Sequence, residues 1–254
     1  MKITTEKIPM NTVLLAALMI AITSTVISCS KQTGEKEMKP ADTSLQSQLD
    51  GRRNAFTAKA PESVKKTYAE GLQAVEASGV VEQAKQLGEI APDFTLANAA
   101  GEPVRLSDYL KKGPVVLTWY RGGWCPYCNL MLNALQQELP NIKALGATLI
   151  ALTPELPDQS MSTSEKHALE FEVLSDLDSN VAREYGIVYK LTDDVAKIYE
   201  EKFGLSEYNG NDSSELPLAA TYIIAQDGTI TYAFLDADYR NRAEPSVITA
   251  ELNK

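Results

Sequence analysis

The chain has 254 residues, of which 44% are hydrophobic and 23% charged, the composition of a globular protein that can bury a sizeable core. Its net charge of −10 argues against nucleic acid as a partner, because a phosphate backbone requires a basic binding face. A single histidine, His167, excludes a histidine-rich metal site, and we expect neither a resident metal nor a cofactor. Three cysteines, Cys29, Cys125 and Cys128, cannot all pair within one chain.

Residues 1–28 have the features of a secretory signal. Lys2 and Lys7 make a weakly basic start, and residues 13–22 form an apolar run that is short for a membrane span. The run leads to Val26-Ile27-Ser28-Cys29, which resembles the bacterial lipobox. The resemblance implies cleavage before Cys29 and lipidation of its sulfur, which would hold the mature chain at a bacterial membrane outside the cytoplasm. The alternative is a short uncleaved anchor with an incidental cysteine.

Residues 29–43 are polar and lack an apolar period, which is typical of a flexible tether. Residues 44–88 then show two helical patterns and form a predicted helical extension. Gly79 suits the end of the second helix. We expect a structural role for this extension, or a surface for self-association into a homo-oligomer. The apolar positions that carry the two patterns are Leu45, Leu49 and Phe56, then Val64, Tyr68, Leu72 and Val75.

Residues 89–254 have the pattern of an α/β domain. A strand, helix, strand, helix order followed by a hairpin and a closing helix predicts a central mixed sheet flanked by helices. The β-branched and aromatic segment 114–120 is the clearest buried strand. The other expected strands are 93–96, 147–152, 171–174, 221–225 and 229–234, and the expected helices are 129–139, 162–169, 179–185 and 245–252.

Cys125 and Cys128 lie in the segment Arg121-Gly122-Gly123-Trp124-Cys125-Pro126-Tyr127-Cys128, between the strand at 114–120 and the next helix. A thiol at a helix N-terminus is stabilised as the thiolate, which is its reactive form. Arg121 is close enough in sequence to lower a thiol pKa or to stabilise a developing oxyanion. Trp124 could shield the thiol or only pack. With Cys29 assigned to lipid, these two cysteines form the one remaining pair, and we expect thiol–disulfide redox chemistry.

Other interpretations of the two cysteines are weaker. A structural zinc ion needs about four ligands, and Cys125, Cys128 and His167 supply three. Covalent haem requires a histidine directly after Cys128, where Asn129 stands. A structural disulfide is compatible with an oxidising compartment, although closing so small a loop stabilises a fold little. We expect His167 to face solvent on a surface helix, and Asp236, Asp238 and Arg240 to form a loop network or a surface ion pair.

Three segments resemble the peroxiredoxin family (alkyl hydroperoxide reductase/thiol-specific antioxidant) of the thioredoxin-like superfamily. They are Ala91-Pro92-Asp93-Phe94-Thr95-Leu96, residues 119–128 and the strand at 221–224, and the resemblance extends over about 87–252. It implies a thioredoxin-like fold and a thiol peroxidase. In that chemistry a thiolate attacks a peroxide and becomes a sulfenic acid, which a resolving thiol converts to a disulfide. An external, thioredoxin-like dithiol donor then reduces the disulfide.

The chain departs from the family pattern around the cysteines. Counted back from Cys128, the family's usual Pro and Thr positions hold Arg121 and Cys125, and counted back from Cys125 they hold Thr118 and Gly122. The arginine that many members carry just before the strand at 221–224 is also absent, since residues 219 and 220 are alanines.

The Trp-Cys-x-x-Cys pattern is a thioredoxin or glutaredoxin feature. A second hypothesis is therefore a thiol–disulfide oxidoreductase acting on protein or small disulfides, and a third is an anchored binding module with a structural disulfide. The helix terminus and this pattern favour Cys125 as the attacking thiol and Cys128 as the resolving one, whereas alignment with the peroxiredoxins favours Cys128 as the attacker.

Overall fold

The computed structural model describes residues 44–98 and 100–254. The predicted signal, the lipidation site Cys29 and the tether at 29–43 lie outside the described residues. Within the described ranges, no helix is both long enough and apolar enough to cross a membrane.

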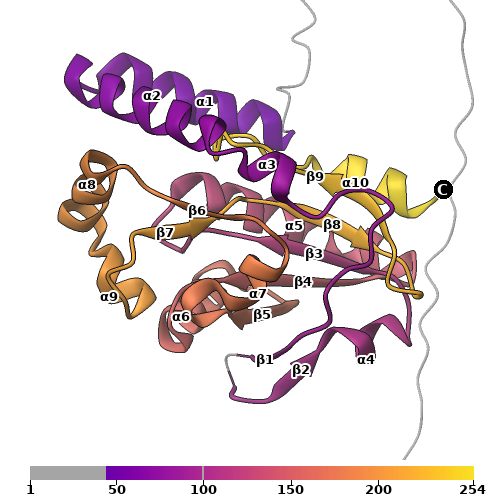
Figure 1. Cartoon of the computed structure of the whole chain (residues 1–254). Coiled ribbons are helices and arrows are strands. Elements are labelled where there is room, and N and C mark those ends of the chain that lie inside the picture. The colour runs from indigo at the N-terminus through magenta and orange to yellow at the C-terminus, as the bar shows by residue number, and fades with distance from the viewer. Residues whose placement is uncertain (1–43, 99) are drawn as a thin grey trace, which may run out of the picture. The chain divides into compact units, whose positions relative to one another are not determined.

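The described chain forms a layered α/β structure whose helices lie on both sides of a central sheet (Figure 1). In chain order the elements are α1 (Leu45–Lys59), α2 (Glu62–Ala77), α3 (Val80–Gln83), β1 (Thr95–Ala97), β2 (Pro103–Arg105), α4 (Leu106–Leu110), β3 (Val115–Trp119), α5 (Pro126–Ala144), β4 (Thr148–Thr153), α6 (Pro157–His167), β5 (Glu172–Ser175), the 3₁₀ turn η1 (Leu177–Ser179), α7 (Asn180–Glu184), β6 (Val188–Lys190), α8 (Asp193–Phe203), α9 (Leu205–Asn209), β7 (Glu215–Pro217), β8 (Thr221–Ile224), β9 (Ile230–Phe234) and α10 (Pro245–Leu252).

The central sheet has the strand order β5-β4-β3-β8-β9. Strands β3, β4 and β5 are parallel, whereas β8 pairs antiparallel with both β3 and β9. Helix connections link the parallel strands, and a tight turn links β8 to β9, so each pairing has the connection its direction requires. The observed architecture confirms the predicted mixed sheet flanked by helices.

Strand β3 lies at the centre of the sheet, and its five residues are all buried. Alternate side chains enter different cores: Val115, Leu117 and Trp119 belong to one hydrophobic cluster, and Val116 belongs to the other. A strand that is buried on both faces has a nearly continuous run of apolar residues instead of an alternating pattern, and this explains the sequence of β3. The end of β3 therefore delivers the residues that follow it to the interior of the molecule.

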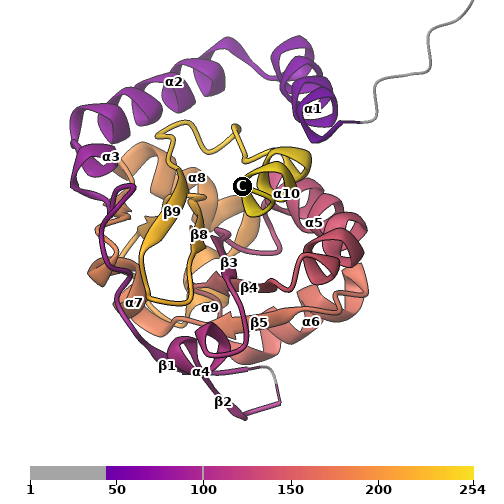
Figure 2. The same ribbon diagram turned by 90° about the vertical axis from the view of Figure 1, so that its right-hand side faces the viewer.

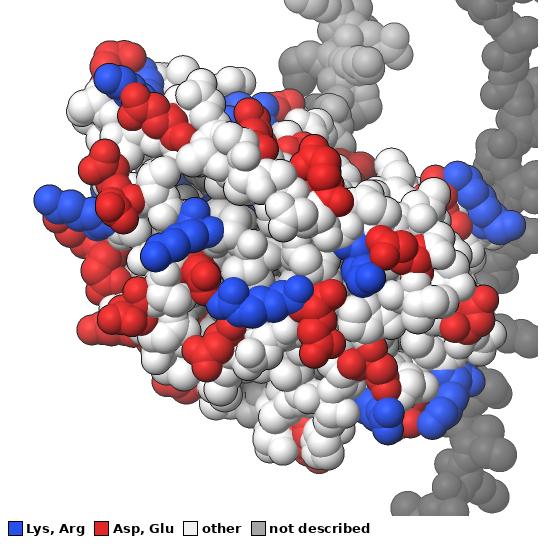
Figure 3. Space-filling view, viewed as in Figure 1, with Lys and Arg blue, Asp and Glu red and all other residues white. Residues whose placement is uncertain are grey.

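The N-terminal helical extension that the sequence predicts is present as α1 to α3 and packs against the rest of the described chain. Leu45 and Leu49 of α1 enter the core beside α5, whereas Val75 and Val80 enter the opposite core. Figure 2 shows α1 and α2 along one side of the molecule, above α10 and α8. The surface seen from the same side in Figure 3 carries acidic and basic side chains interspersed, and the acidic ones gather over α8 and α9.

The predicted elements match most of the described ones, with two kinds of difference. Helices α5 and α6 begin earlier than the apolar periodicity indicates, at Pro126 and Pro157, because proline is well suited to the first turn of a helix. The sequence patterns also predict no element for residues 103–110, which form β2 and α4, or for residues 188–217, which form β6, α8, α9 and β7. Helix α8 matters most, because it carries part of the candidate site.

Candidate active site

The two cysteines lie where β3 ends and α5 begins. Cys125 is the N-cap of α5, and Cys128 lies in its first turn behind Pro126. Gly122 and Gly123 allow the connecting loop to fit. Gly122 has a φ of 147°, and a Cβ there would lie 2.2 Å from the ring of Trp124, whereas a Cβ on Gly123 would lie 2.1 Å from the hydroxyl of Thr163.

The sulfur of Cys128 is fully buried and surrounded by donors. The backbone N–H of Arg121 and Nη2 of Arg242 each donate to it at 3.4 Å. Burial acts to raise the pKa of Cys128, but a hydrogen bond from the Cys125 thiol and the charges of Arg242 and Arg121 hold it well below its ordinary value. These donors favour ionisation of Cys128 over ionisation of Cys125.

Cys125 is buried as well, and both cysteines are free thiols in this structure. Burial, together with the hydrogen bond to Cys128, raises the pKa of Cys125 well above its ordinary value. Cys125 thus retains its proton and donates it toward the neighbouring sulfur. The helix N-terminus predicts a low pKa for Cys125, but desolvation and the adjacent thiolate outweigh that influence.

Arg242 is the residue near the thiolate that the sequence analysis missed. It lies 114 residues from Cys128 along the chain, and its side chain is 4% exposed. Its Nη1 donates to the backbone carbonyls of Tyr239 and Asn241, which fixes the guanidinium beside the sulfur. This chain has alanines where many family members carry an arginine before the strand at 221–224, and a guanidinium reaches Cys128 from the loop before α10 instead. No local motif marks this arginine.

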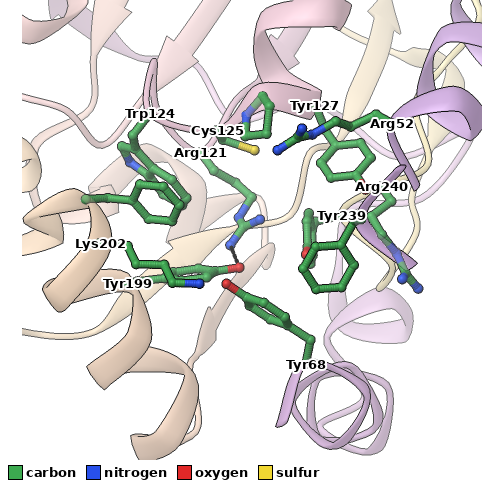
Figure 4. Close-up of a pocket in the computed structure, with 13 residues that line it drawn as sticks. Arg52, Tyr68, Arg121, Trp124, Cys125, Tyr127, Tyr199, Lys202, Tyr239 and Arg240 are labelled. Carbon is green, nitrogen blue, oxygen red and sulfur yellow. Dashed lines mark hydrogen bonds between the residues drawn. The ribbon is translucent and has the colours of Figure 1, made fainter. Parts of the chain in front are cut away.

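Arg121 is placed beside the pair, but its backbone and side chain face different partners. The backbone N–H reaches Cys128, whereas the guanidinium points into an adjoining cavity (Figure 4). There Nη2 donates to the hydroxyl of Tyr199 at 2.7 Å, and the guanidinium carbon lies 4.1 Å from the centre of the Tyr239 ring and 5.1 Å from that of Trp124. The side chain is 1% exposed.

The cavity has a volume of about 280 Å³ and opens directly onto Cys125, whereas Cys128 is not part of its lining. Besides the dithiol loop and α5, its wall comes from helices α1, α2 and α8 and from the loop before α10. Trp124 both packs and lines the cavity, because its ring stacks on that of Phe203 with 5.1 Å between centres. The lining residues are Arg52, Phe56, Tyr68, Arg121, Trp124, Cys125, Pro126, Tyr127, Tyr199, Lys202, Phe203, Tyr239 and Arg240 (Figure 4).

Glu155 is a second residue that sequence reasoning missed. Its carboxylate is fully buried after β4 and accepts hydrogen bonds from the Gly123 N–H at 2.8 Å and from the Thr153 hydroxyl at 3.3 Å. Burial raises the pKa of Glu155 to about 7. The carboxylate therefore holds the glycine loop and titrates near neutral pH. An isolated glutamate after a strand gives no sequence signal for either role.

The remaining predicted polar residues lie outside the cavity, except for Arg240, which lines it. His167 on α6 is partly buried rather than solvent-facing, and its Nδ1 shares a hydrogen bond with Asn133 at 3.0 Å. Asp238 forms a two-pronged ion pair with Arg240, and Asp236 accepts a hydrogen bond from the Asp238 N–H, as the loop-network prediction requires. Across residues 44–98 and 100–254, no group of three histidine, cysteine or acidic side chains could hold a metal ion.

Comparison with known proteins gives several relatives of similar sequence. The peroxiredoxin Bcp of Escherichia coli K12 is 31% identical over 101 residues, which are 39% of this chain and 64% of Bcp, so the chain spans just under two thirds of that relative. A putative peroxiredoxin bcp of Haemophilus influenzae is 28% identical over 148 residues, which are 58% of this chain and 84% of that protein.

Two solved structures resemble the described fold. Peroxidoxin BcpB of Mycobacterium tuberculosis has a TM-score of 0.53 at 20% identity, over 66% of this chain and 96% of that chain. The reduced 2-Cys peroxiredoxin of Plasmodium vivax has a TM-score of 0.52 at 16% identity, over 66% of this chain and 81% of that chain. These similarities confirm the thioredoxin-like fold.

The family assignment depends on the length of the match. The AhpC/TSA family matches residues 87–233, which are more than half of the 254-residue chain and include both cysteines of the dithiol. Helices α1 to α3 precede the matched residues, so the α1 and α2 wall of the cavity is additional to the family domain. The chain belongs to the AhpC/TSA family.

Proposed function

We propose that this chain is a thiol-dependent peroxidase in which Cys128 attacks the peroxide and Cys125 resolves the product. The observation that carries the proposal is the pair of donors on the Cys128 sulfur, the Arg121 N–H and Arg242 Nη2. They favour a thiolate in the resting state and can also stabilise the negative charge that develops on the departing oxygen. Membership of the AhpC/TSA family supports this assignment.

In the first step the Cys128 thiolate attacks the terminal oxygen of the peroxide. The O–O bond breaks, an S–O bond forms, and the departing alkoxide or hydroxide takes a proton, so that Cys128 becomes a sulfenic acid. The Cys125 sulfur then attacks the sulfenic acid sulfur of Cys128. A disulfide forms, and the hydroxyl leaves as water with the proton of Cys125. The two electrons that reduce the peroxide thus come from the dithiol.

An external dithiol donor completes the cycle. Because Cys125 lines the cavity and Cys128 does not, the donor's thiolate is expected to attack the Cys125 sulfur. Cys128 is then the leaving group, and its lowered pKa makes it a good one. The donor's second thiol displaces Cys125 from the mixed disulfide. This order reverses the preference for Cys125 as attacker, because burial and Cys128 itself keep the Cys125 proton in place.

The assignment is tested with single cysteine variants of the reduced chain and one equivalent of hydrogen peroxide. In Cys125→Ser, peroxide is consumed once and mass spectrometry finds a sulfenic acid trapped on Cys128. In Cys128→Ser, consumption falls to the rate of an ordinary thiol. Rapid consumption by Cys128→Ser, with the sulfenic acid on Cys125, would reverse the roles. Slow consumption by the native dithiol would refute the peroxidase proposal.

A second candidate function is thiol–disulfide exchange with protein or small disulfides. It is favoured by the position of Cys125, which caps α5 and lines the cavity. Insulin reduction driven by dithiothreitol distinguishes the two functions, because an oxidoreductase accelerates it and a dedicated peroxidase does not. If Cys125→Ser and Cys128→Ser leave both activities unchanged, the dithiol is structural, as in a binding module.

We also propose that Cys29 is lipidated and anchors the mature chain outside the cytoplasm. The support is the apolar run at 13–22 followed by Val26-Ile27-Ser28-Cys29. Expressed in a bacterium, the chain should enter the membrane fraction, and mass spectrometry of its N-terminal peptide should find an acylated Cys29. A Cys29→Ser variant should not be acylated. Equal membrane association of both forms would contradict the proposal.

A further inference from the structure

The lining of the cavity beside Cys125 carries positive charge although the chain is acidic overall. Arg52, Arg121, Lys202 and Arg240 all line it, and none of its lining residues is an aspartate or glutamate. The chain as a whole has a net charge of −10, and acidic side chains gather over α8 and α9 on the outer surface (Figure 3). The lining therefore carries an excess of positive charge, which favours an anionic occupant.

Arg121 is the most buried of these cations, and its charge acts on the two thiols but faces no carboxylate. Its guanidinium is 1% exposed, and no acidic side chain in the described part of the chain pairs with it. Nη2 is bound to the Tyr199 hydroxyl, whereas Nε and Nη1 have no hydrogen-bond partner among the described residues. A buried cation is costly unless an anion or further acceptors face it, and aromatic rings compensate only in part.

The walls around Arg121 suit an apolar body. Phe56 of α1, Tyr68 of α2 and Phe203 of α8 present aromatic rings to the same space, together with Trp124 and Tyr239 (Figure 4). The volume of about 280 Å³ fits a small organic molecule and excludes a folded protein segment. Two of these rings belong to helices that precede the family match, so this wall is a feature of the present chain.

We propose that the cavity binds a small organic anion, with its carboxylate-like group on the guanidinium of Arg121 and its apolar body on the aromatic wall. Either of the two unpartnered N–H groups of Arg121 can donate a charge-assisted hydrogen bond to a carboxylate oxygen. In the peroxidase proposed above, such an anion lies on the Cys125 side of the dithiol, where Arg121 favours ligands that carry a carboxylate over neutral ones with the same body. Arg121 is then a specificity-determining residue, distinct from Arg242 at the thiolate.

Binding to the full chain is measured by calorimetry with a matched pair of probes, 3-phenylpropanoate and its neutral amide 3-phenylpropanamide. The acid should bind at least about tenfold more tightly, because a charge-assisted hydrogen bond stabilises a complex more than a neutral one. It should also change the fluorescence of Trp124, which lines the cavity. Equal affinities for acid and amide, or no binding of either, overturn the proposal.

Variants locate the anion site. Arg121→Gln should abolish the preference for the acid over the amide, whereas Lys202→Gln, at another cation of the same lining, should retain it. Loss of the preference in Lys202→Gln alone would move the site away from Arg121. Tyr199→Phe covers the case in which Arg121→Gln does not fold. It releases Nη2 of Arg121, so acid binding should tighten and amide binding should not, and unchanged acid binding would count against the site.

These measurements use neither peroxide nor a reductant, so their outcome is independent of the peroxidase assay. If the chain prefers the acid but does not reduce peroxide, the anion site is supported and the peroxidase function is refuted. If the chain reduces peroxide rapidly but binds acid and amide equally, the peroxidase function is supported and the anion site is refuted.

Discussion

At the residue scale, the most informative contrast is between two cysteines that are three positions apart. Both are buried at the start of α5, yet the pKa of Cys128 is lowered and that of Cys125 is raised. The difference comes from their neighbours, because Arg242 and the Arg121 N–H face only Cys128. Position at a helix N-terminus is shared by both and therefore cannot decide which of them ionises.

Replacing Arg242 tests this account. Arg242→Gln should raise the pKa of Cys128 toward that of an ordinary thiol and slow peroxide reduction at neutral pH by about tenfold or more, because less thiolate is present. The thiolate is followed by its ultraviolet absorbance as a function of pH. Arg240→Gln, which removes an arginine paired with Asp238, serves as the control and should leave the titration in place. Coincident titrations of Arg242→Gln and the native chain would contradict the assignment.

Glu155 makes a separate prediction about stability. Its pKa is raised from 4.5 to about 7, so the folded state holds the proton more tightly than the unfolded chain. Its contribution to stability is complete below about pH 4.5 and is lost as the pH rises through about 7.

Glu155→Gln should remove this dependence, because the amide still accepts the Gly123 N–H but does not titrate. The difference in unfolding free energy between the native chain and the variant should change by about 3 kcal/mol between pH 4 and pH 8. Urea denaturation at a series of pH values measures it, and parallel pH profiles for the two proteins would refute the assignment.

At the element scale, the loop between β3 and α5 places both sulfurs, and it can do so only with two glycines. The loop passes so close to α6 that a Cβ on Gly123 would collide with the Thr163 hydroxyl. The N–H of Gly123 also binds the Glu155 carboxylate. The loop is therefore held by packing on one side and by a buried hydrogen bond on the other.

Gly123→Ala should destabilise the fold by about 1–3 kcal/mol, because the loop or α6 must move to admit the methyl group. Gly51→Ala makes the same chemical change in α1, where nothing lies within 4 Å of the added carbon. It should stabilise the chain slightly, since alanine favours a helix interior. Thermal unfolding of both variants provides the comparison, and a Gly123→Ala variant as stable as the native chain would show that the loop is not tightly held.

At the scale of the whole molecule, the helical extension and the thiolate are connected through the loop before α10. Arg53 of α1 donates to Asn241 at 2.7 Å, and the Glu244 carboxylate accepts the backbone N–H groups at the start of α1, at 3.1 and 3.0 Å. Between these two anchors lies Arg242, which reaches Cys128. Helix α1 thus helps to hold the guanidinium that stabilises the thiolate.

Glu244→Ala should loosen this connection, because it leaves the first N–H groups of α1 without their carboxylate and costs about 1 kcal/mol. Hydrogen exchange should speed up in α1 and in residues 236–244 together, and the pKa of Cys128 should rise. Glu251→Ala, which removes a carboxylate paired with Lys254 on α10, is the matched control. Faster exchange in α1 without any change in the thiol titration would show that α1 does not help to hold Arg242 beside Cys128.

Much of the fold and the centre of the site can be predicted from the sequence because their signals are local. The apolar run that forms β3, the hairpin of β8 and β9, and the helix at 245–252 follow from periodicity and turn residues. The spacing of Cys125 and Cys128 marks the dithiol in the same way. The sequence patterns do not predict helices α8 and α9, and so they do not predict the part of the cavity wall that holds Tyr199 and Phe203.

The sequence by itself determined the α/β class, the family resemblance and the pair of cysteines, because these depend on residues close together along the chain. Only the tertiary structure shows which sulfur is surrounded by donors that favour its ionisation. That choice depends on burial and on Arg242, which lies 114 residues from Cys128 and reaches it across the fold. The buried Glu155 and the Arg121 cavity were likewise decided by tertiary contacts, because desolvation and long-range proximity leave no local pattern in a sequence.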